Sequence, residues 1–125
     1  MDNLKFRKQA PGTETERMSF VRRADLFIDE HLCEKISLQM LCDTCYLSMY
    51  HYVREFKKEA GVTPKQYVIR RKLKAAEHLL RHSDLKVYEV AERIGYEPSQ
   101  FVTLFRKNCG MPPAQFRERV LNEVS

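Results

Sequence analysis

Apolar side chains recur every three or four residues along most of this chain from Ser19 onward, which is the spacing of helices with one buried face. Helix starts are marked by Ser19 and Ser48, which are favoured N-cap residues, and by Pro64, which suits a first turn. Gly61 and Gly110 are placed to end helices. No stretch alternates with period two for long, so the pattern predicts an all-α fold. We expect about seven helices, at residues 20–31, 38–45, 49–60, 64–83, 87–94, 98–109 and 113–122.

One segment of the chain occurs twice in similar form. The stretch FKKEAGVTPKQY, Phe56 to Tyr67, is followed 49 residues later by FRKNCGMPPAQF, Phe105 to Phe116, and the two align without a gap. A helical solenoid usually needs at least three repeats, so two copies indicate a duplicated domain. The identical pairs include Val53 with Val102, Phe56 with Phe105, Lys58 with Lys107, Gly61 with Gly110, Pro64 with Pro113 and Gln66 with Gln115.

Each copy contains a short helix, a brief turn and a second helix that begins with polar residues. That order is typical of a helix-turn-helix, whose second helix lies in the major groove of DNA. The i, i+4 spacing predicts that Tyr52 with Phe56, and Phe101 with Phe105, face inward. The outward residues are then Met49, Tyr50, Val53, Arg54 and Lys57 in the first copy, and Ser99, Gln100, Val102, Thr103 and Arg106 in the second. As alternatives, the two valines could be plain core residues and Tyr50 could complete the packing.

The outward residue types suit DNA. Arginine can bond bidentately to guanine and glutamine to adenine, while a valine or threonine methyl can meet the methyl group of thymine. The basic side chains, including Lys72 and Lys74 of the long helix, are suited to phosphates, which position a protein without specifying a sequence. Our candidates for phosphate contact are Ser48, Lys57, Lys58, Arg70, Arg71, Arg106 and Lys107.

Charge supports a polyanionic partner. The 125-residue chain has a formal net charge of +5, yet residues 54–74 alone hold eight basic residues against two glutamates. Such a concentration favours nucleic acid, although a solvated helix face is the plainer alternative. A second rival is a basic helical module that binds an acidic protein or RNA without preferring a DNA sequence.

Composition places the protein among folded, soluble chains, with 43% hydrophobic and 31% charged residues. No apolar run approaches a membrane span and no signal peptide opens the chain, so we expect a cytoplasmic protein without a membrane partner. We divide it into a flexible leader or linker (1–17), a first helix-turn-helix subdomain (18–63), a connecting helix (64–82) and a second helix-turn-helix subdomain (83–125).

Cys42 and Cys45 have the C-x-x-C spacing of zinc and redox sites. Zinc would need two further ligands, and no second pair in a suitable context accompanies them. The repeat places Ala91 and Ile94 at the equivalent positions, which indicates two packing thiols. We therefore expect no metal and no cofactor, with a thiol- or metal-responsive sensor as the rival. No Cys/His or paired-carboxylate constellation indicates an enzyme.

The stretches LSMYHYVREFKKEAGVTPKQYV and VYEVAERIGYEPSQFVTLFRKNCGMPPAQFRER resemble the two halves of the AraC/XylS-type DNA-binding domain, over roughly residues 19–121. The resemblance implies two homeodomain-like helix-turn-helix subdomains joined by a long central helix, and transcription control, most often activation through RNA polymerase. By motif position it implies that the residues reading bases are Tyr50, Val53, Arg54, Ser99, Gln100 and Thr103.

The two turns differ in one residue that matters, because Gly95 of the second copy corresponds to Tyr46 in the first. A left-handed backbone costs a non-glycine residue ~1–2 kcal/mol, so the first turn could adopt another conformation.

A central helix from Pro64 to about Arg81 would be ~27 Å long, whereas successive major grooves lie ~34 Å apart on one face of DNA. We expect a monomer that binds an asymmetric promoter site and bends it. Seventeen leading residues leave no room for a ligand-binding domain, which fits either regulation through abundance or the DNA-binding part of a longer regulator.

Overall fold

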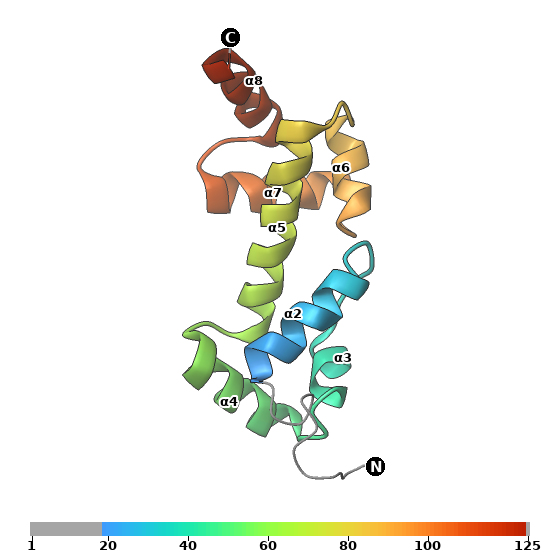
Figure 1. The fold of residues 1–125 in the computed structure, drawn as a ribbon, viewed down its shortest axis with the longest axis vertical. Helices are drawn as coiled ribbons and strands as arrows, with labels where there is room; N and C mark the ends of the chain where they lie inside the picture. Colours follow the sequence, from blue (N-terminus) through green and yellow to red (C-terminus); the bar gives the residue numbers. More distant parts are fainter. Residues whose placement is uncertain (1–18, 125) are drawn as a thin grey trace. The chain divides into compact units, whose positions relative to one another are not determined.

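The computed structural model describes residues 19–124, so the predicted leader at residues 1–17 lies outside the described part. This part contains seven α-helices and no strand (Figure 1), as the sequence predicts. Four helices end one or two residues earlier than expected and the last ends two residues later. The helices are α2 (Phe20–Glu30), α3 (Leu38–Asp43), α4 (Met49–Ala60), α5 (Pro64–His82), α6 (Val87–Arg93), α7 (Pro98–Cys109) and α8 (Pro113–Val124).

Short side chains start three of the helices by accepting hydrogen bonds from free backbone N–H groups. The hydroxyl oxygen of Ser19 accepts from the N–H of Arg22 at 3.0 Å, and Ser48 accepts from His51 at 3.2 Å. Ser37 caps α3 in the same way. At the other ends, Gly61 and Gly110 stop α4 and α7 in the left-handed conformation, with φ of 82° and 85°. These starts and stops are local, which is why the sequence pattern locates them.

The chain forms two compact units. Among the described residues, the first unit comprises residues 19–30 together with Ser37–Pro64, and the second comprises His31–Ile36 and residues 65–124. In the first unit α4 packs against α2 and α3. Tyr52 and Phe56 of α4 are fully buried, as predicted, and the ring of Phe20 meets the Tyr52 ring edge-on at 6.0 Å.

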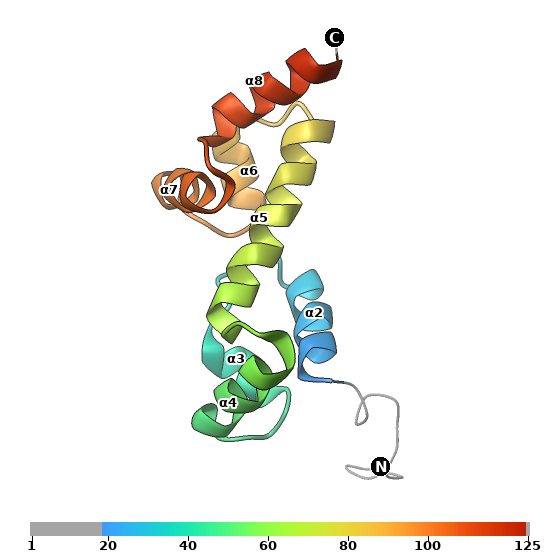
Figure 2. The same cartoon turned by 90° about the vertical axis from the view of Figure 1, so that its left-hand side faces the viewer.

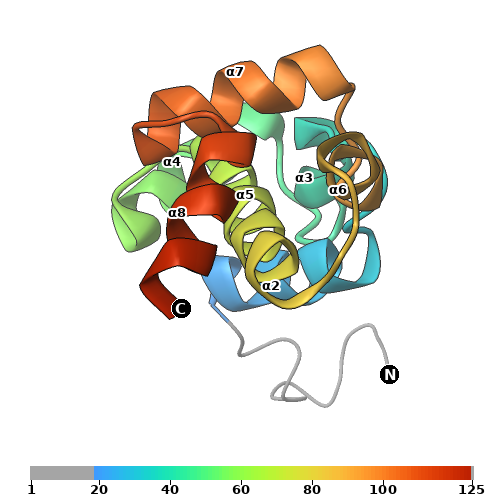
Figure 3. The ribbon, with the colours of Figure 1, turned by 90° about the horizontal axis from the view of Figure 1, so that it is seen from above.

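The second unit builds its core from α5, α6 and α7 (Figure 2). Viewed along α5, the axis of α7 runs across it (Figure 3). Phe101 and Phe105 point inward as predicted, and the Phe105 ring meets that of Phe116 from α8 at 5.4 Å. The buried residues of this core are Leu73, Ala76, Leu80, Val90, Ala91, Ile94, Phe101 and Phe105.

Lys72 corrects one expectation from the sequence, which counted it among the basic surface residues of the long helix. Its side chain is only 1% exposed, and its ammonium donates hydrogen bonds to the backbone carbonyls of Leu32, Glu34 and Ile94. A buried ammonium with three carbonyl acceptors has no donor left for a phosphate. Lys72 therefore contributes to the core of the second unit rather than to a DNA-facing surface.

Arg117 of α8 closes the C-terminal end of α5. Its guanidinium donates to the backbone carbonyls of Leu80, Ser83 and Leu85, of which the first lies 3.1 Å from Nε. The last carbonyls of a helix have no partner within the helix, and a cation there also interacts favourably with the helix dipole. This arrangement explains physically why an arginine follows the aromatic residue Phe116 in the second copy.

Candidate nucleic-acid interface

The outward face of α4 is exposed and carries the residue types expected from the sequence. Tyr50 is 76% exposed and Met49 is 41% exposed at the start of the helix. Arg54 follows one turn later and is also exposed, whereas Val53 is half-buried. Residues three and four apart share one face of a helix, so Tyr50, Val53 and Arg54 lie together.

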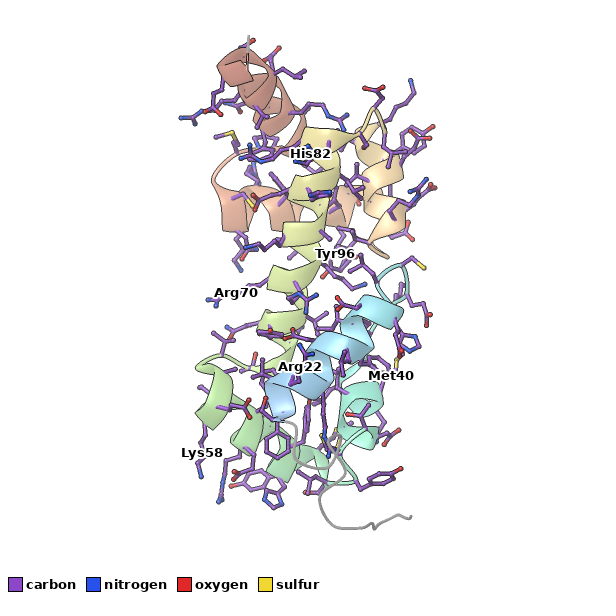
Figure 4. The ribbon with its side chains drawn as sticks, viewed as in Figure 1. Arg22, Met40, Lys58, Arg70, His82 and Tyr96 are labelled. Atoms are coloured by element: carbon purple, nitrogen blue, oxygen red, sulfur yellow. The ribbon has the colours of Figure 1, made fainter. Side chains whose placement is uncertain are left out.

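One carboxylate lies beside the basic residues of α4. The Oε2 atom of Glu55 is 3.7 Å from Nε of Arg54, 3.6 Å from Nζ of Lys58 and 4.0 Å from Nε2 of His51. Exposed ion pairs such as these contribute little and are weakened by salt. Lys58 and Lys57 are exposed, and Figure 4 shows the Lys58 side chain extending away from the ribbon. The cations of α4 are thus available to an external anion.

The outward face of α7 is exposed in the same way. Ser99, Gln100 and Thr103 are all exposed in its first two turns. Val102 is 37% exposed, so the alternative that it is a plain core residue is wrong. Arg106 and Lys107 are exposed in the last turn. The helix therefore presents uncharged hydrogen-bonding groups first and basic groups last.

The other predicted phosphate contacts are placed less uniformly. Arg70 of α5 is exposed, and its side chain points away from the ribbon in Figure 4. Arg71 is half-buried. Ser48 is exposed, although its hydroxyl oxygen already accepts the hydrogen bond that starts α4. Its O–H remains as a donor.

The two turns that precede α4 and α7 share a left-handed residue at the same position of the repeat. Tyr46 adopts a φ of 56° and Gly95 a φ of 78°, both in the left-handed region. In the first turn Cys45 N–H donates to the carbonyl of Cys42 at 3.0 Å, and in the second Ile94 N–H donates to Ala91 at 3.2 Å. The first turn is therefore left-handed at this position as well, although a left-handed tyrosine costs ~1–2 kcal/mol.

Of the two cysteines in the C-x-x-C segment, only Cys42 is fully buried as expected. Cys42 is buried, its thiol donates to the carbonyl of Leu47 at 2.7 Å, and burial raises the pKa of this thiol. Cys45 is half-buried, although its counterpart Ile94 is fully buried. Between residues 19 and 124, no three or more His, Cys, Asp or Glu side chains are grouped so that they could hold a metal ion.

The described part of the chain contains no helix that is both long and apolar enough to cross a membrane.

Comparison with known proteins assigns the family. A family model described as a helix-turn-helix domain matches residues 41–119. The chain is 34% identical over 93 residues to the HTH-type transcriptional activator RhaS of Enterobacter sp. (strain 638), covering 74% of this chain and 34% of RhaS. The chain belongs to the AraC/XylS-type DNA-binding domains. Membership confirms the resemblance and the fold that the sequence predicts.

A second relative of this AraC/XylS-type domain is AdaA of Bacillus subtilis (strain 168), named a bifunctional transcriptional activator and DNA repair enzyme. It is 36% identical over 93 residues, which cover 74% of this chain and 44% of AdaA. The chain therefore spans about a third to under half the length of these two curated relatives.

A solved structure supports the same assignment. The DNA-binding domain of AdpA, a global transcriptional factor solved in complex with a target DNA, superposes on this AraC/XylS-type domain with a TM-score of 0.76. The two are 30% identical, and the match covers 82% of this chain and 93% of the AdpA domain.

Proposed function

We propose that this chain binds double-stranded DNA sequence-specifically and regulates transcription by inserting α4 and α7 into successive major grooves. The observation that carries the proposal is that both second helices of the duplicated motif expose outward side chains at matching positions, such as Tyr50 with Ser99 and Arg54 with Thr103, while their aromatic i, i+4 pairs are buried. The AdpA domain, which has the same fold, was solved with a target DNA.

We assign base contacts and phosphate contacts to different side chains. The proposed base contacts are Tyr50, Val53 and Arg54 from α4 and Ser99, Gln100 and Thr103 from α7. The proposed phosphate contacts are Ser48, Lys57, Lys58, Arg70, Arg71, Arg106 and Lys107. Arg54 suits guanine and Gln100 suits adenine, because each can form two hydrogen bonds to one base.

The regulator is proposed to be an activator that acts at a promoter through RNA polymerase. RhaS carries the name of a transcriptional activator, which supports this direction. AdaA is named a repair enzyme as well, but this chain corresponds to 44% of it, and we assign the chain DNA binding without catalysis or a cofactor. We further propose that this chain binds as a monomer and acts in the cytoplasm. In the proposed division, the subdomains 18–63 and 83–125 each supply one reading helix, and residues 64–82 connect them.

The bent DNA expected from the sequence stays a prediction. The α5 helix has 19 residues, which corresponds to ~28 Å, against ~34 Å between successive major grooves. Circularly permuted DNA fragments carrying the binding site would migrate differently according to the position of a bend. Equal mobility of all permuted fragments would contradict the prediction.

The decisive experiment is selection of binders from a random duplex DNA pool. We expect one asymmetric motif with two blocks about a helical turn apart. Replacing Arg54 or Gln100 by alanine should relax the preference within one block only, at ~1–3 kcal/mol for that base pair. Lys107→Ala is the matched comparison, since loss of a phosphate contact weakens binding to all sequences and lowers the salt slope by ~1.

The alternative hypothesis is a basic module that binds acidic proteins or RNA, and it predicts a different result. It predicts that the random pool yields no enriched motif and that any DNA binding simply disappears as salt increases. Enrichment of a motif that Arg54→Ala and Gln100→Ala leave unchanged would refute the assignment of the two reading helices, even if the protein binds DNA.

A further inference from the structure

The turn before α4 holds a tyrosine in a conformation that suits glycine. Tyr46 has a φ of 56°, and it is the one non-glycine residue with positive φ among residues 19–124. Its side chain is 93% exposed, so packing within the described part of the chain gives almost nothing in return for the strained backbone. For folding alone, glycine would serve better at this position.

The equivalent turn of the second copy shows what the fold itself requires. A Cβ atom added to Gly95 would lie 2.7 Å from the carbonyl oxygen of Glu34 and 2.9 Å from Nζ of Lys72. That turn therefore excludes a side chain by lack of space as well as by its backbone. The first turn has open space instead, and a large aromatic group occupies it.

Tyr46 is part of a group of exposed apolar side chains at the start of α4. Met49 and Tyr50, in the first turn of the helix, are exposed as well. Isolated exposed apolar residues need no explanation, but three within five positions, followed by exposed cations at Arg54 and Lys57, indicate a binding surface. A tyrosine adds a hydroxyl that can donate to an anionic oxygen.

The surroundings favour DNA over other partners of this surface. The cations beside it attract a polyanion, and the start of the second helix of a helix-turn-helix is the part that meets the groove. Backbone N–H groups at a helix start also suit a phosphate. A phenol at that place can donate to a phosphate oxygen while its ring lies against a deoxyribose.

We propose that Tyr46 is a positioning residue for DNA binding, whose hydroxyl donates to a backbone phosphate at the edge of the groove that receives α4. This inference rests on the proposed function and adds to it a contact that the motif does not supply. Because a phosphate contact carries no sequence information, Tyr46 sets the depth and register of α4 without reading a base.

The test combines stability with DNA affinity, using the full chain and the duplex selected as described above. Tyr46→Gly should raise the urea midpoint of unfolding, because it relieves the left-handed strain. The same variant should bind the duplex roughly ten- to 150-fold more weakly, which is the range for one hydrogen bond to a charged group. A purely structural role would move stability and affinity in the same direction.

Two further variants of Tyr46 separate the contribution of the hydroxyl from that of the ring, and a third variant serves as a control. Tyr46→Phe keeps the ring and should show most of the loss, since the hydroxyl makes the phosphate contact. Tyr46→Asn removes the ring but tolerates the left-handed backbone, and should bind as weakly as the glycine variant. Leu26→Ala removes an exposed apolar side chain from α2 of the same unit and should leave affinity unchanged.

Wild-type affinity for Tyr46→Gly would overturn the inference, and so would a changed motif in a repeated selection, because a positioning contact does not read bases. If the wild-type chain itself selected no duplex, the proposed function would fail together with the inference. The wild-type arm shows that outcome by itself, so the two failures can be told apart.

Discussion

The side-chain nitrogen of Lys72 lies 2.6 Å from the backbone carbonyl oxygen of Ile94, the residue at the turn that leads into α7. The same nitrogen donates to the carbonyl of Leu32 at 3.0 Å and to that of Glu34. The ring of Tyr96 lies over it, with its centroid 5.3 Å away. One buried ammonium thus ties the turn before α7 to the segment 31–36 of the same unit.

Replacing Lys72 by methionine should destabilise the protein by about 3 kcal/mol, because it leaves buried carbonyl oxygens without a donor. Urea denaturation measures this change. Lys74→Met is the matched control, since Lys74 is exposed two residues further along the same helix, and its loss should stay within ~0.5 kcal/mol. Equal effects of the two substitutions would show that the ammonium of Lys72 is not part of the fold.

The Lys72 site also predicts a pH dependence. Burial lowers the pKa of Lys72 below its ordinary value of 10.5. Between the lowered pKa and 10.5 the unfolded chain binds more protons than the folded one, so stability rises with pH in that window. The wild-type protein should therefore gain stability relative to Lys72→Met as the pH approaches 10.5. A difference that is flat or falls over this range would show that burial does not lower the pKa of Lys72.

Gly95 and Gly110 allow a matched comparison of space and strain in the second unit. Both are left-handed, with φ of 78° and 85°, but an added Cβ meets backbone and Lys72 only at Gly95 and open space at Gly110. Gly110→Ala should cost about 1–2 kcal/mol, the strain alone. Gly95→Ala should cost clearly more, because the Cβ displaces the Lys72 ammonium from its carbonyls. Urea midpoints of the two variants measure the difference, and equal midpoints would refute the crowding.

Much of this fold follows from local signals in the sequence. Serines that cap helices, glycines that stop them and aromatic pairs at i, i+4 act within one turn of their own position, so Ser48, Gly61 and the Tyr52–Phe56 pair could be placed without coordinates. Because the sequence repeats, the same helix boundaries and buried positions could then be predicted for the second copy.

Lys72 and Tyr46 show where prediction from local sequence signals fails. A lysine in a basic run reads as surface, yet Lys72 continues the i+4 row of the buried residues Val68, Ala76 and Leu80, and its acceptors come from two distant segments. The i+4 spacing could have indicated that Lys72 is buried. The carbonyl groups that accept its hydrogen bonds could not be predicted from the sequence. At Tyr46 the left-handed backbone favours glycine. The turn accommodates a tyrosine there because open space surrounds it, which only a three-dimensional structure shows.

The four thiols should react at different rates, which tests the rival reading of a thiol sensor. Cys33 is exposed and Cys42 is buried, and burial raises the pKa of Cys42, so its reactive thiolate is scarce. With a thiol reagent under native conditions, Cys33 should be labelled first and Cys42 only on unfolding, as mass spectrometry of peptides would show. Cys33→Ser removes the fast phase as a control. Fast native labelling of both Cys42 and Cys45 would revive the sensor.

Tyr52 has a buried hydroxyl without a hydrogen-bond partner among the described residues. Its counterpart in the second copy is Phe101, which fills the same inward position without a hydroxyl. A buried polar group that lacks a partner costs free energy. Burial of this group also raises the pKa of Tyr52, since the charged phenolate is even less tolerated than the neutral phenol.

Tyr52→Phe should therefore stabilise the first unit by about 1 kcal/mol, measured by urea denaturation at neutral pH. Phe101→Tyr is the reciprocal change and should destabilise the second unit by a similar amount or more. In the unfolded chain a tyrosine ionises near pH 10, at about its ordinary pKa. The folded wild-type protein keeps the proton longer, so its stability relative to Tyr52→Phe should fall as the pH rises above ~10. A loss of stability in Tyr52→Phe at neutral pH would show that the hydroxyl has a partner, a water molecule included.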